Sequence, residues 1–132
     1  MNRFKKLEKK NMRILSVDDG LENRIIITKF LQNLFEVEDA VNAIEAIQKA
    51  KREKYDLILM DISLDGVIDG RTAAKEIRKI CGYKDIPIIA ITGYAFLTDR
   101  EELFREGFNG FLAKPYCKEQ LIEIVEQHLK IK

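Results

Sequence analysis

Short aliphatic runs alternate with longer amphipathic stretches along this chain, which is the arrangement expected of parallel βα units. Five runs are candidate strands: Arg13–Val17, Phe35–Ala40, Asp56–Met60, Ile86–Ile91 and Asn109–Ala113. The third and fourth runs are almost entirely apolar, as expected of strands that are covered on both faces. We therefore expect these two strands in the centre of a parallel sheet.

Amphipathic spacing predicts five helices between and after these strands. Their ranges are Glu22–Leu34, Ala43–Ala50, Arg71–Ile80, Asp99–Glu106 and Lys118–Leu129. Thr98 or Asp99 can cap the fourth helix because each has a glutamate three residues later, and Gly107 stands where that helix should end. The sequence thus predicts an α/β fold with a single, doubly wound, five-stranded parallel sheet flanked by five helices.

Composition indicates one soluble globular domain. The chain has 132 residues, of which 46% are hydrophobic and 34% charged, and its net charge of +1 lacks the basic footprint of a direct nucleic-acid binder. Residues 1–10 alone carry five basic side chains and one acid, which leaves a mildly acidic remainder. We expect a basic tail or linker over residues 1–11 and the domain over residues 12–132.

Cysteine usage and hydropathy favour a cytoplasmic protein. Cys81 and Cys117 stand far apart, without a further Cys or His at metal-ligand spacing, which argues against a zinc module or a disulfide framework. No apolar run approaches the ~18 residues needed to cross a bilayer, and no apolar signal region follows the first lysines. We therefore expect neither membrane insertion nor export.

Polar residues stand where four of the predicted strands end. Asp18 and Asp19 follow the first strand, Asp61 the third, Thr92 the fourth and Lys114 the fifth. Ligands of an open α/β sheet bind beyond these carboxyl ends. Three carboxylates brought together repel one another unless a hard divalent cation such as Mg²⁺ accepts their oxygens. Thr92 and Lys114 suit the oxygens of a transferred phosphoryl group, and Asp61 is the candidate nucleophile.

Five motifs stand in a characteristic order: ILSVDD (14–19), DLILMD (56–61), DG (69–70), PIIAITGYA (87–95) and GFLAKP (110–115). Together they resemble the receiver domain of two-component response regulators, including the receivers of hybrid histidine kinases, from Met12 to Leu129. The resemblance implies that Asp61 is the phosphorylated aspartate and Asp19 a direct Mg²⁺ ligand. It also implies that Asp18 acts through metal-bound water and that the backbone carbonyl of Ser63 completes the protein ligands.

The resemblance further implies that Thr92 and Lys114 grip the phosphoryl oxygens, that Phe111 occupies an aromatic switch position, and that the peptide before Pro115 is cis. The chain departs from the family in three places. The loop between Asp61 and the DG motif has one residue more than usual, Phe111 replaces a commoner Tyr and lacks its hydroxyl, and Gly93 stands where Ala is usual.

The resemblance implies a phosphorelay receiver that accepts phosphate from a histidine kinase or a His-phosphotransfer protein onto Asp61. Such a domain is not a classical enzyme, although it catalyses its own phosphorylation and slow autodephosphorylation. Phosphorylation is expected to alter binding of a protein partner or dimerisation through the last helices. Both a stand-alone regulator and a receiver of a hybrid kinase are open, and the Lys-rich start slightly favours the second.

Other functions and blander roles compete with this interpretation. A pseudo-receiver would use the same fold only for binding. A Mg²⁺-dependent phosphatase of the haloacid-dehalogenase type needs an aspartate two residues after its nucleophile, where this chain has Ser63. A flavodoxin-like flavin carrier is disfavoured because Asp18 and Asp19 would repel the FMN phosphate. Taken alone, Asp18-Asp19-Gly20 could be only a turn and helix cap, and Phe111 only a half-buried core ring.

Overall fold

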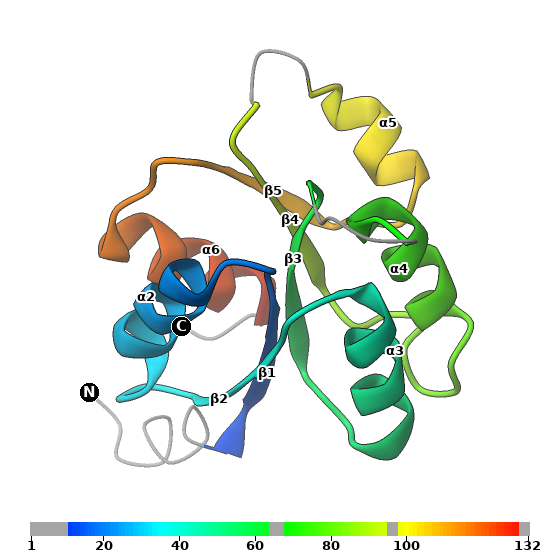
Figure 1. Cartoon of the computed structure of the whole chain (residues 1–132), viewed down its shortest axis with the longest axis horizontal. Coiled ribbons are helices and arrows are strands. Elements are labelled where there is room, and N and C mark those ends of the chain that lie inside the picture. The colour runs from blue at the N-terminus through cyan, green and yellow to red at the C-terminus, as the bar shows by residue number, and fades with distance from the viewer. Residues whose placement is uncertain (1–10, 64–67, 95–97, 130–132) are drawn as a thin grey trace.

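The computed structural model describes residues 11–63, 68–94 and 98–129, and Figure 1 shows their arrangement. Five parallel strands form one sheet in the order β2-β1-β3-β4-β5. Their bounds are β1 Arg13–Val17, β2 Glu36–Ala40, β3 Leu57–Asp61, β4 Ile88–Thr92 and β5 Gly110–Ala113. The chain moves outward from β1 to β2 and then returns to β3 on the other side of β1, so the winding direction reverses between β1 and β3. That reversal is where a doubly wound sheet binds ligands.

Five helices in the described ranges cover the two faces of the sheet. Their bounds are α2 Leu21–Leu31, α3 Ala43–Arg52, α4 Gly70–Arg78, α5 Arg100–Arg105 and α6 Lys118–Leu129. Figure 1 shows α2 and α6 on one face and α3, α4 and α5 on the other. The predicted fold class is confirmed. None of these helices is both long and apolar enough to cross a bilayer.

Strand alternation divides the buried side chains into two core layers. Leu57 and Leu59 of β3 lie in the layer beneath α2 and α6, whereas Ile58 and Met60 lie in the layer beneath α3 and α4. Every residue of β3 and β4 is buried, as the continuous apolar runs predicted. Because β3 is apolar on both faces, it fixes the position of the aspartate at its end.

Several element ends differ from the sequence prediction by one to three residues. Helix α2 ends at Leu31 instead of Leu34, because the N–H groups of Leu34 and Phe35 both turn back to the carbonyl oxygen of Leu31 at 2.9 Å. Leu34 nevertheless packs against the α2 and α6 core layer, which explains why its spacing looked helical. Strand β3 includes Asp61, one residue beyond the predicted end, since the Ile62 N–H continues the ladder to the carbonyl of Ile91.

The predicted start and stop of α5 are confirmed. Asp99, not Thr98, caps this helix, because its Oδ1 accepts the N–H groups of Glu101 and Glu102. Gly107 follows the helix with φ +103°, a left-handed conformation in which glycine is favoured.

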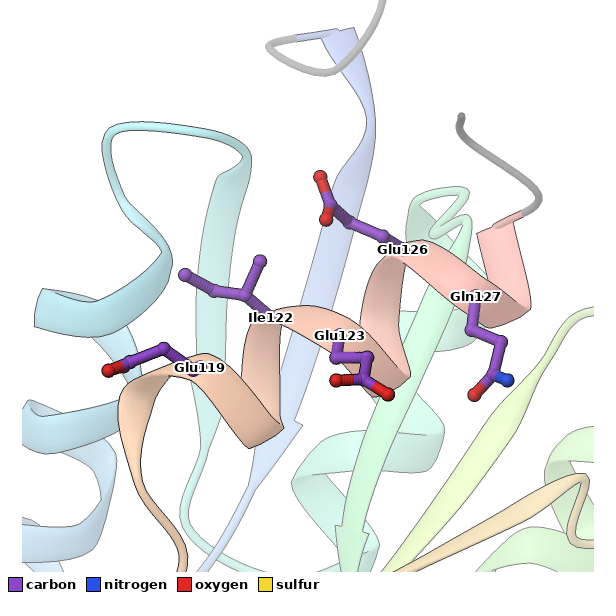
Figure 2. Close-up of a pocket in the computed structure, with 5 residues that line it drawn as sticks. All are labelled: Glu119, Ile122, Glu123, Glu126 and Gln127. Carbon is purple, nitrogen blue, oxygen red and sulfur yellow. The ribbon is translucent and has the colours of Figure 1, made fainter.

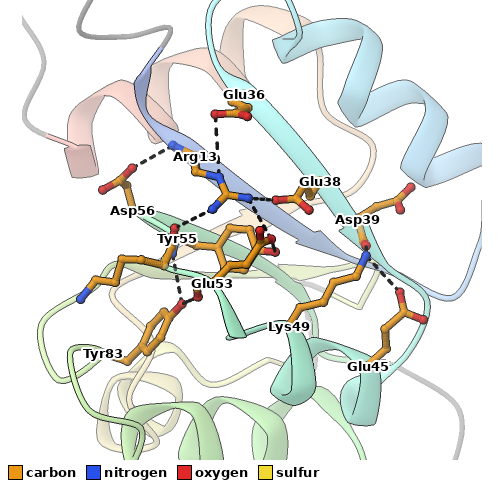
Figure 3. A network of polar contacts seen from close by, with 11 residues as sticks. Arg13, Glu36, Glu38, Asp39, Glu45, Lys49, Glu53, Tyr55, Asp56 and Tyr83 are labelled. Carbon is orange, nitrogen blue, oxygen red and sulfur yellow. Dashed lines mark hydrogen bonds and ion pairs between the residues drawn. The ribbon is translucent and has the colours of Figure 1, made fainter. Parts of the chain in front are cut away.

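A polar network lies at the amino end of the sheet, around the start of β1 (Figure 3). Arg13 is its centre, and its ion-pair partners are Glu36, Glu38 and Glu53. The guanidinium also lies over the Tyr55 ring, 5.0 Å from its centroid. The Tyr83 hydroxyl donates to the Glu53 carbonyl oxygen at 2.7 Å and accepts the Tyr55 N–H at 3.1 Å. The network ties β1 to β2 and to the segment after α3, so this end of the sheet is structural.

Candidate active site

Three aspartates meet at the carboxyl end of the sheet. Asp18 and Asp19 follow β1, Asp61 ends β3, and each offers a carboxylate oxygen within 4.8 Å of the others. Asp18 and Asp61 are 2% and 4% exposed, whereas Asp19 is exposed. The grouping expected from the strand ends is therefore present in the structure, with two carboxylates buried and one open to solvent.

The turn after β1 holds Asp18 in place. Oδ1 of Asp18 accepts the Gly20 N–H at 2.8 Å, and Nδ2 of Asn23 lies 3.4 Å from the same oxygen. Arg24 donates from Nη1 to the Asp18 carbonyl oxygen at 2.8 Å. Gly20 is the N-cap of α2, and no side chain caps that helix. The tripeptide therefore does form a turn whose last residue is the N-cap of α2, but the cap bond is not made by an aspartate side chain.

Both carboxylate oxygens of Asp61 have partners. Oδ1 accepts the Ser63 N–H and the Ser63 hydroxyl, each at 2.8 Å, and Oδ2 accepts the Lys114 ammonium at 3.1 Å. Burial raises the pKa of Asp61, but the Ser63 hydrogen bonds and the Lys114 charge outweigh burial and bring the pKa below its ordinary value. Asp61 is consequently ionised at neutral pH, the state that a nucleophile requires.

Lys114 lies between two of the carboxylates. Its Nζ is 3.1 Å from Asp61 Oδ2 and 3.5 Å from Asp18 Oδ2. Burial lowers the pKa of Lys114, but contact with Asp61 and Asp18 raises it overall, so the ammonium is charged. The Lys114 N–H donates to the Thr92 carbonyl oxygen at 2.8 Å, and the Lys114–Pro115 peptide is cis, as the resemblance implied.

One ammonium does not balance three carboxylates. Burial raises the pKa of Asp18, with the charge of Asp61 acting in the same direction. The site therefore has an excess of negative charge on hard oxygen atoms, which is the donor set that Mg²⁺ prefers.

Thr92 is buried at the end of β4. Its Oγ1 accepts the Tyr94 N–H at 3.0 Å and lies 3.4 Å from Oγ1 of Thr98. The Thr98 hydroxyl donates its hydrogen to the Tyr94 carbonyl oxygen at 2.8 Å, so the Thr92 hydroxyl must be the donor in the longer contact. A contact of 3.4 Å between two hydroxyls is weak. The Thr92 hydrogen is therefore free to move to a better acceptor.

Phe111 is half-buried and lies on the same face of the sheet as Thr92. The β4–β5 register pairs Ala90 with Phe111 and Thr92 with Ala113, and alternation places Thr92 on the same face as Ala90. The Phe111 ring packs against the core layer beneath α3 and α4, and the Arg100 guanidinium lies 4.9 Å from its centroid. Both a core role and a switch role are consistent with this position.

Gly70 contributes to the site in a way that sequence reasoning missed. A Cβ at this position would lie 2.3 Å from the Asp61 carbonyl oxygen and 2.9 Å from Cα of Ile62. The first turn of α4 thus lies directly against the end of β3, and Asp69 caps it by accepting the Thr72 N–H at 2.9 Å. The only sequence signal was the DG pair itself. The longer loop predicted before that pair includes residues 64–67, which lie outside the described residues.

A pocket of about 540 Å³ opens beside Lys114, between α2 and the segment after β5. Asn23, Ile26 and Phe30 line it from α2, and Tyr116 lines it from the opposite side. Burial raises the pKa of Tyr116 to about 12, with smaller effects from Asp18 and Asp61. Neither Asn23 nor Tyr116 carried a sequence signal, because only the fold brings them to the aspartates.

The sequence profile of the response regulator receiver domain matches residues 14–126. This chain belongs to that family. The geometry of the site fits a receiver. Membership of this family decides against the two alternatives, a haloacid-dehalogenase-type phosphatase and a flavodoxin-like flavin carrier. Receiver domains of two-component systems interact with histidine kinases or phosphotransfer proteins.

Among curated relatives, this receiver is 35% identical over 121 residues to the sensor histidine kinase CheAY of Helicobacter pylori, covering 89% of the chain and 15% of the relative. It is 33% identical over 111 residues to the probable transcriptional regulator ycf29 of Porphyra purpurea, covering 80% of the chain and 53% of the relative. The chain thus spans about half, or much less, of the length of these relatives.

Two solved structures show the same architecture. The receiver domain of sensor histidine kinase PA1611 from Pseudomonas aeruginosa PAO1, described with a magnesium ion coordinated in the active site cleft, is 36% identical with a TM-score of 0.83. The alignment covers 91% of this chain and 98% of that one. The chemotaxis protein CheY4 of Vibrio cholerae is 30% identical with a TM-score of 0.80, covering 88% and 97%.

Proposed function

We propose that this receiver accepts a phosphoryl group onto Asp61 from a phosphohistidine of a histidine kinase or His-phosphotransfer protein. An Asp61 oxygen forms a bond to phosphorus while the phosphorus–nitrogen bond breaks, and the departing imidazole nitrogen keeps the electron pair. The observation that carries the proposal is the state of Asp61: it is buried, ionised, and fixed by Ser63 and Lys114. A pseudo-receiver would have no need of a carboxylate prepared in this way.

Mg²⁺ fits the excess of carboxylate oxygen at this site. Asp19 and Asp61 would be its direct side-chain ligands, with Asp18 contributing from the buried side and the Ser63 backbone carbonyl completing the set. When bound, Mg²⁺ would offset the negative charge that builds up between the carboxylates and the phosphoryl oxygens. The exposure of Asp19 leaves this cluster open to an ion from solvent.

Lys114 and Thr92 would hold the phosphoryl oxygens. Lys114 already contacts Asp61 Oδ2, so a small movement of Nζ brings its charge to an oxygen of the new group. Phosphorylation adds about −1.5 to −2 charges and three strong acceptors. The Thr92 hydroxyl would then exchange its 3.4 Å contact with Thr98 for one of these acceptors.

Movement of Thr92 would free space on the face where Phe111 packs. Because Phe111 has no hydroxyl, inward rotation of the ring would depend on packing and on its contact with Arg100. Such a rotation would reshape the surface made by α5, β5 and α6, where we expect a phosphorylation-dependent partner or a dimer contact.

The α2 side of the site suits a protein donor. Leu21, Ile25 and Ile26 are 62%, 44% and 43% exposed, and Ile26 lines the pocket beside Lys114. Exposed aliphatic side chains next to a buried nucleophile favour docking of an apolar protein surface that carries the phosphohistidine.

Intact-mass spectrometry after incubation with Mg²⁺ and acetyl phosphate tests the proposal. We expect one phosphoryl group on the wild-type protein, none on Asp61→Asn, and none after chelation. The exposed Asp85→Asn variant is the matched control and should be labelled like the wild type. Labelling of Asp61→Asn would move the site elsewhere, and an unlabelled wild-type protein would favour the pseudo-receiver.

A further inference from the structure

A cavity of about 260 Å³ lies against the Asp61 site on the side of α4 and α5. Its lining comes from the loop after β3, the first turn of α4 and the region that follows β4. The described residues that line it are Ile62, Ser63, Arg71, Thr92, Tyr94 and Thr98. A groove on α6, in contrast, is lined by residues of that helix and shares none of them with the Asp61 site (Figure 2). A change at Asp61 therefore acts directly on the 260 Å³ cavity.

This cavity places one cation next to the proposed phosphoryl acceptor. Ser63 donates its N–H and its hydroxyl to Asp61 Oδ1, each at 2.8 Å, and Thr92 ends the neighbouring strand β4. Arg71 is the one charged side chain among the described lining residues. It follows Gly70, where an added Cβ would lie 2.3 Å from the Asp61 carbonyl oxygen. The Arg71 side chain thus starts beside the end of β3.

The Arg71 guanidinium contacts α5. Its Nη1 donates to Oε1 of Glu102 at 3.1 Å and to Oε1 of Glu106 at 2.6 Å. The side chains of Arg71 and Glu106 are 27% and 17% exposed, so water screens this pair less than a fully exposed one. Leu103 is the only buried residue of α5. Because this helix has little apolar anchorage, its ion pairs with α4 help to hold it in place.

Arg71 is able to exchange partners. Both of its hydrogen bonds to the glutamates come from a single nitrogen. A phosphoryl group on Asp61 offers three oxygens and more negative charge than the carboxylate that it replaces, and a guanidinium can bind two such oxygens at once. Nζ of Lys75 lies 3.8 Å from Oε2 of Glu106. This glutamate therefore keeps a cation nearby when Arg71 leaves.

We propose that Arg71 couples phosphorylation of Asp61 to the packing of α5 against α4. In the unphosphorylated protein, Arg71 holds α5 through Glu102 and Glu106. After phosphorylation, its guanidinium moves into the cavity and binds the phosphoryl oxygens, which releases α5. The inference rests on the proposed phosphorylation of Asp61 and gives the phosphoryl group a second cation besides Lys114. This path needs no hydroxyl on the aromatic residue of β5.

Titration with beryllofluoride in the presence of Mg²⁺ tests the proposal, because this anion stands in for a phosphoryl group and is not hydrolysed. The amide signals of Thr92 and Gly93 report its binding. We expect Arg71→Gln to bind the anion about two- to fivefold more weakly than the wild type does. Glu102→Gln/Glu106→Gln should bind it about two- to fivefold more tightly, since the glutamates no longer compete for the guanidinium. A purely structural ion pair would shift both variants in the same direction.

A combination of these substitutions separates the exchange of partners from a general effect of charge. When Arg71→Gln is already present, Glu102→Gln/Glu106→Gln should give no further gain in affinity, because no guanidinium remains to be released. The same gain in both backgrounds would mean that the glutamates act only through their electrostatic field, and it would overturn the proposal. Lys79→Gln is the matched control. It breaks the ion pair with Glu76 at the end of α4 and should leave the affinity unchanged.

Amide hydrogen exchange of residues 100–106 measures the release of α5. Beryllofluoride should speed this exchange in the wild type and leave that of α3 unchanged. Arg71→Lys keeps the charge but not the two-nitrogen geometry, so it should retain only part of the change. Unchanged exchange of α5 in the saturated wild type would overturn the proposal.

Labelling by acetyl phosphate distinguishes this inference from the proposed function. A wild-type protein that is labelled on Asp61 but fails the titration and exchange tests would refute the coupling through Arg71 alone. An unlabelled wild-type protein would remove the trigger and refute both proposals.

Discussion

Replacement of Gly70 by alanine distinguishes two opposite expectations for the stability of the protein, because α4 begins against the end of β3. Helix propensity alone predicts that Gly70→Ala stabilises the first turn of α4, by up to about 1 kcal/mol. The structure predicts the opposite sign, because the new Cβ would lie 2.3 Å from the Asp61 carbonyl oxygen. Carbon–oxygen contacts normally lie at about 3.3 Å or more, so α4 or β3 must move by about 1 Å.

Overpacking of this size costs about 1–3 kcal/mol. For a domain of this length, such a loss corresponds to a fall in Tm of about 3–15 °C. Urea unfolding and thermal melting measure both quantities. Because the crowded atom belongs to Asp61, we also expect slower labelling by acetyl phosphate in Gly70→Ala.

Gly93→Ala is the matched control at the same edge of the sheet. A Cβ at Gly93 meets no atom within 4 Å among the described residues. Its stability should be unchanged or higher by up to about 1 kcal/mol, since alanine restricts the unfolded chain. A Gly70→Ala protein as stable as the wild type, or more stable, would refute the close approach of α4 to β3.

Three further expectations concern charge. Mg²⁺ at ten times its dissociation constant should stabilise the wild type by about 1.4 kcal/mol, and Asp19→Ala should lose this gain. Equal melting temperatures of the wild type with and without Mg²⁺ would contradict the metal site. Burial and the charge of Asp61 raise the pKa of Asp18, so ionisation of Asp18 lowers the stability of the fold as pH rises. In the presence of a chelator, Asp18→Asn should therefore have a higher free energy of unfolding in urea than the wild type at neutral pH. This advantage should be lost at about pH 3. The Arg13 hydrogen bond lowers the pKa of Glu53, so it stabilises the fold above the ordinary glutamate pKa and ceases to do so in acid. Arg13→Met should therefore destabilise the protein more at neutral pH than at about pH 3. An equal loss of stability at both pH values would argue against the network.

The sequence predicted the fold and the aspartate cluster because both follow from strand ends. Apolar runs located all five strands, and parallel strands bring their carboxyl ends to one edge, so Asp18, Asp61 and Lys114 had to meet. Element ends were less predictable. Leu34 shows why: periodicity reports which side chains are buried, whereas backbone hydrogen bonds decide where a helix ends.

Other parts of the site could not be read from the sequence because they depend on packing between distant segments. The Ser63 hydroxyl on Asp61 follows from the path of the loop after β3, and the need for glycine at position 70 follows from the closeness of α4.

The arrangement of the site divides its two tasks between the two sides of the sheet. Asp61, the proposed phosphoryl acceptor, is held by Ser63 and Lys114 through both carboxylate oxygens, so its position is fixed before any donor arrives. Thr92, in contrast, is held by one backbone N–H and one weak hydroxyl contact, and it shares its face of the sheet with Phe111. Because the acceptor is rigid and the neighbouring hydroxyl is loosely held, the charge of a phosphoryl group would act mainly on the Thr92 hydroxyl. Because Phe111 cannot follow Thr92 through a hydrogen bond of its own, the coupling that we propose would come from the volume that Thr92 vacates and from the Arg100 cation over the ring.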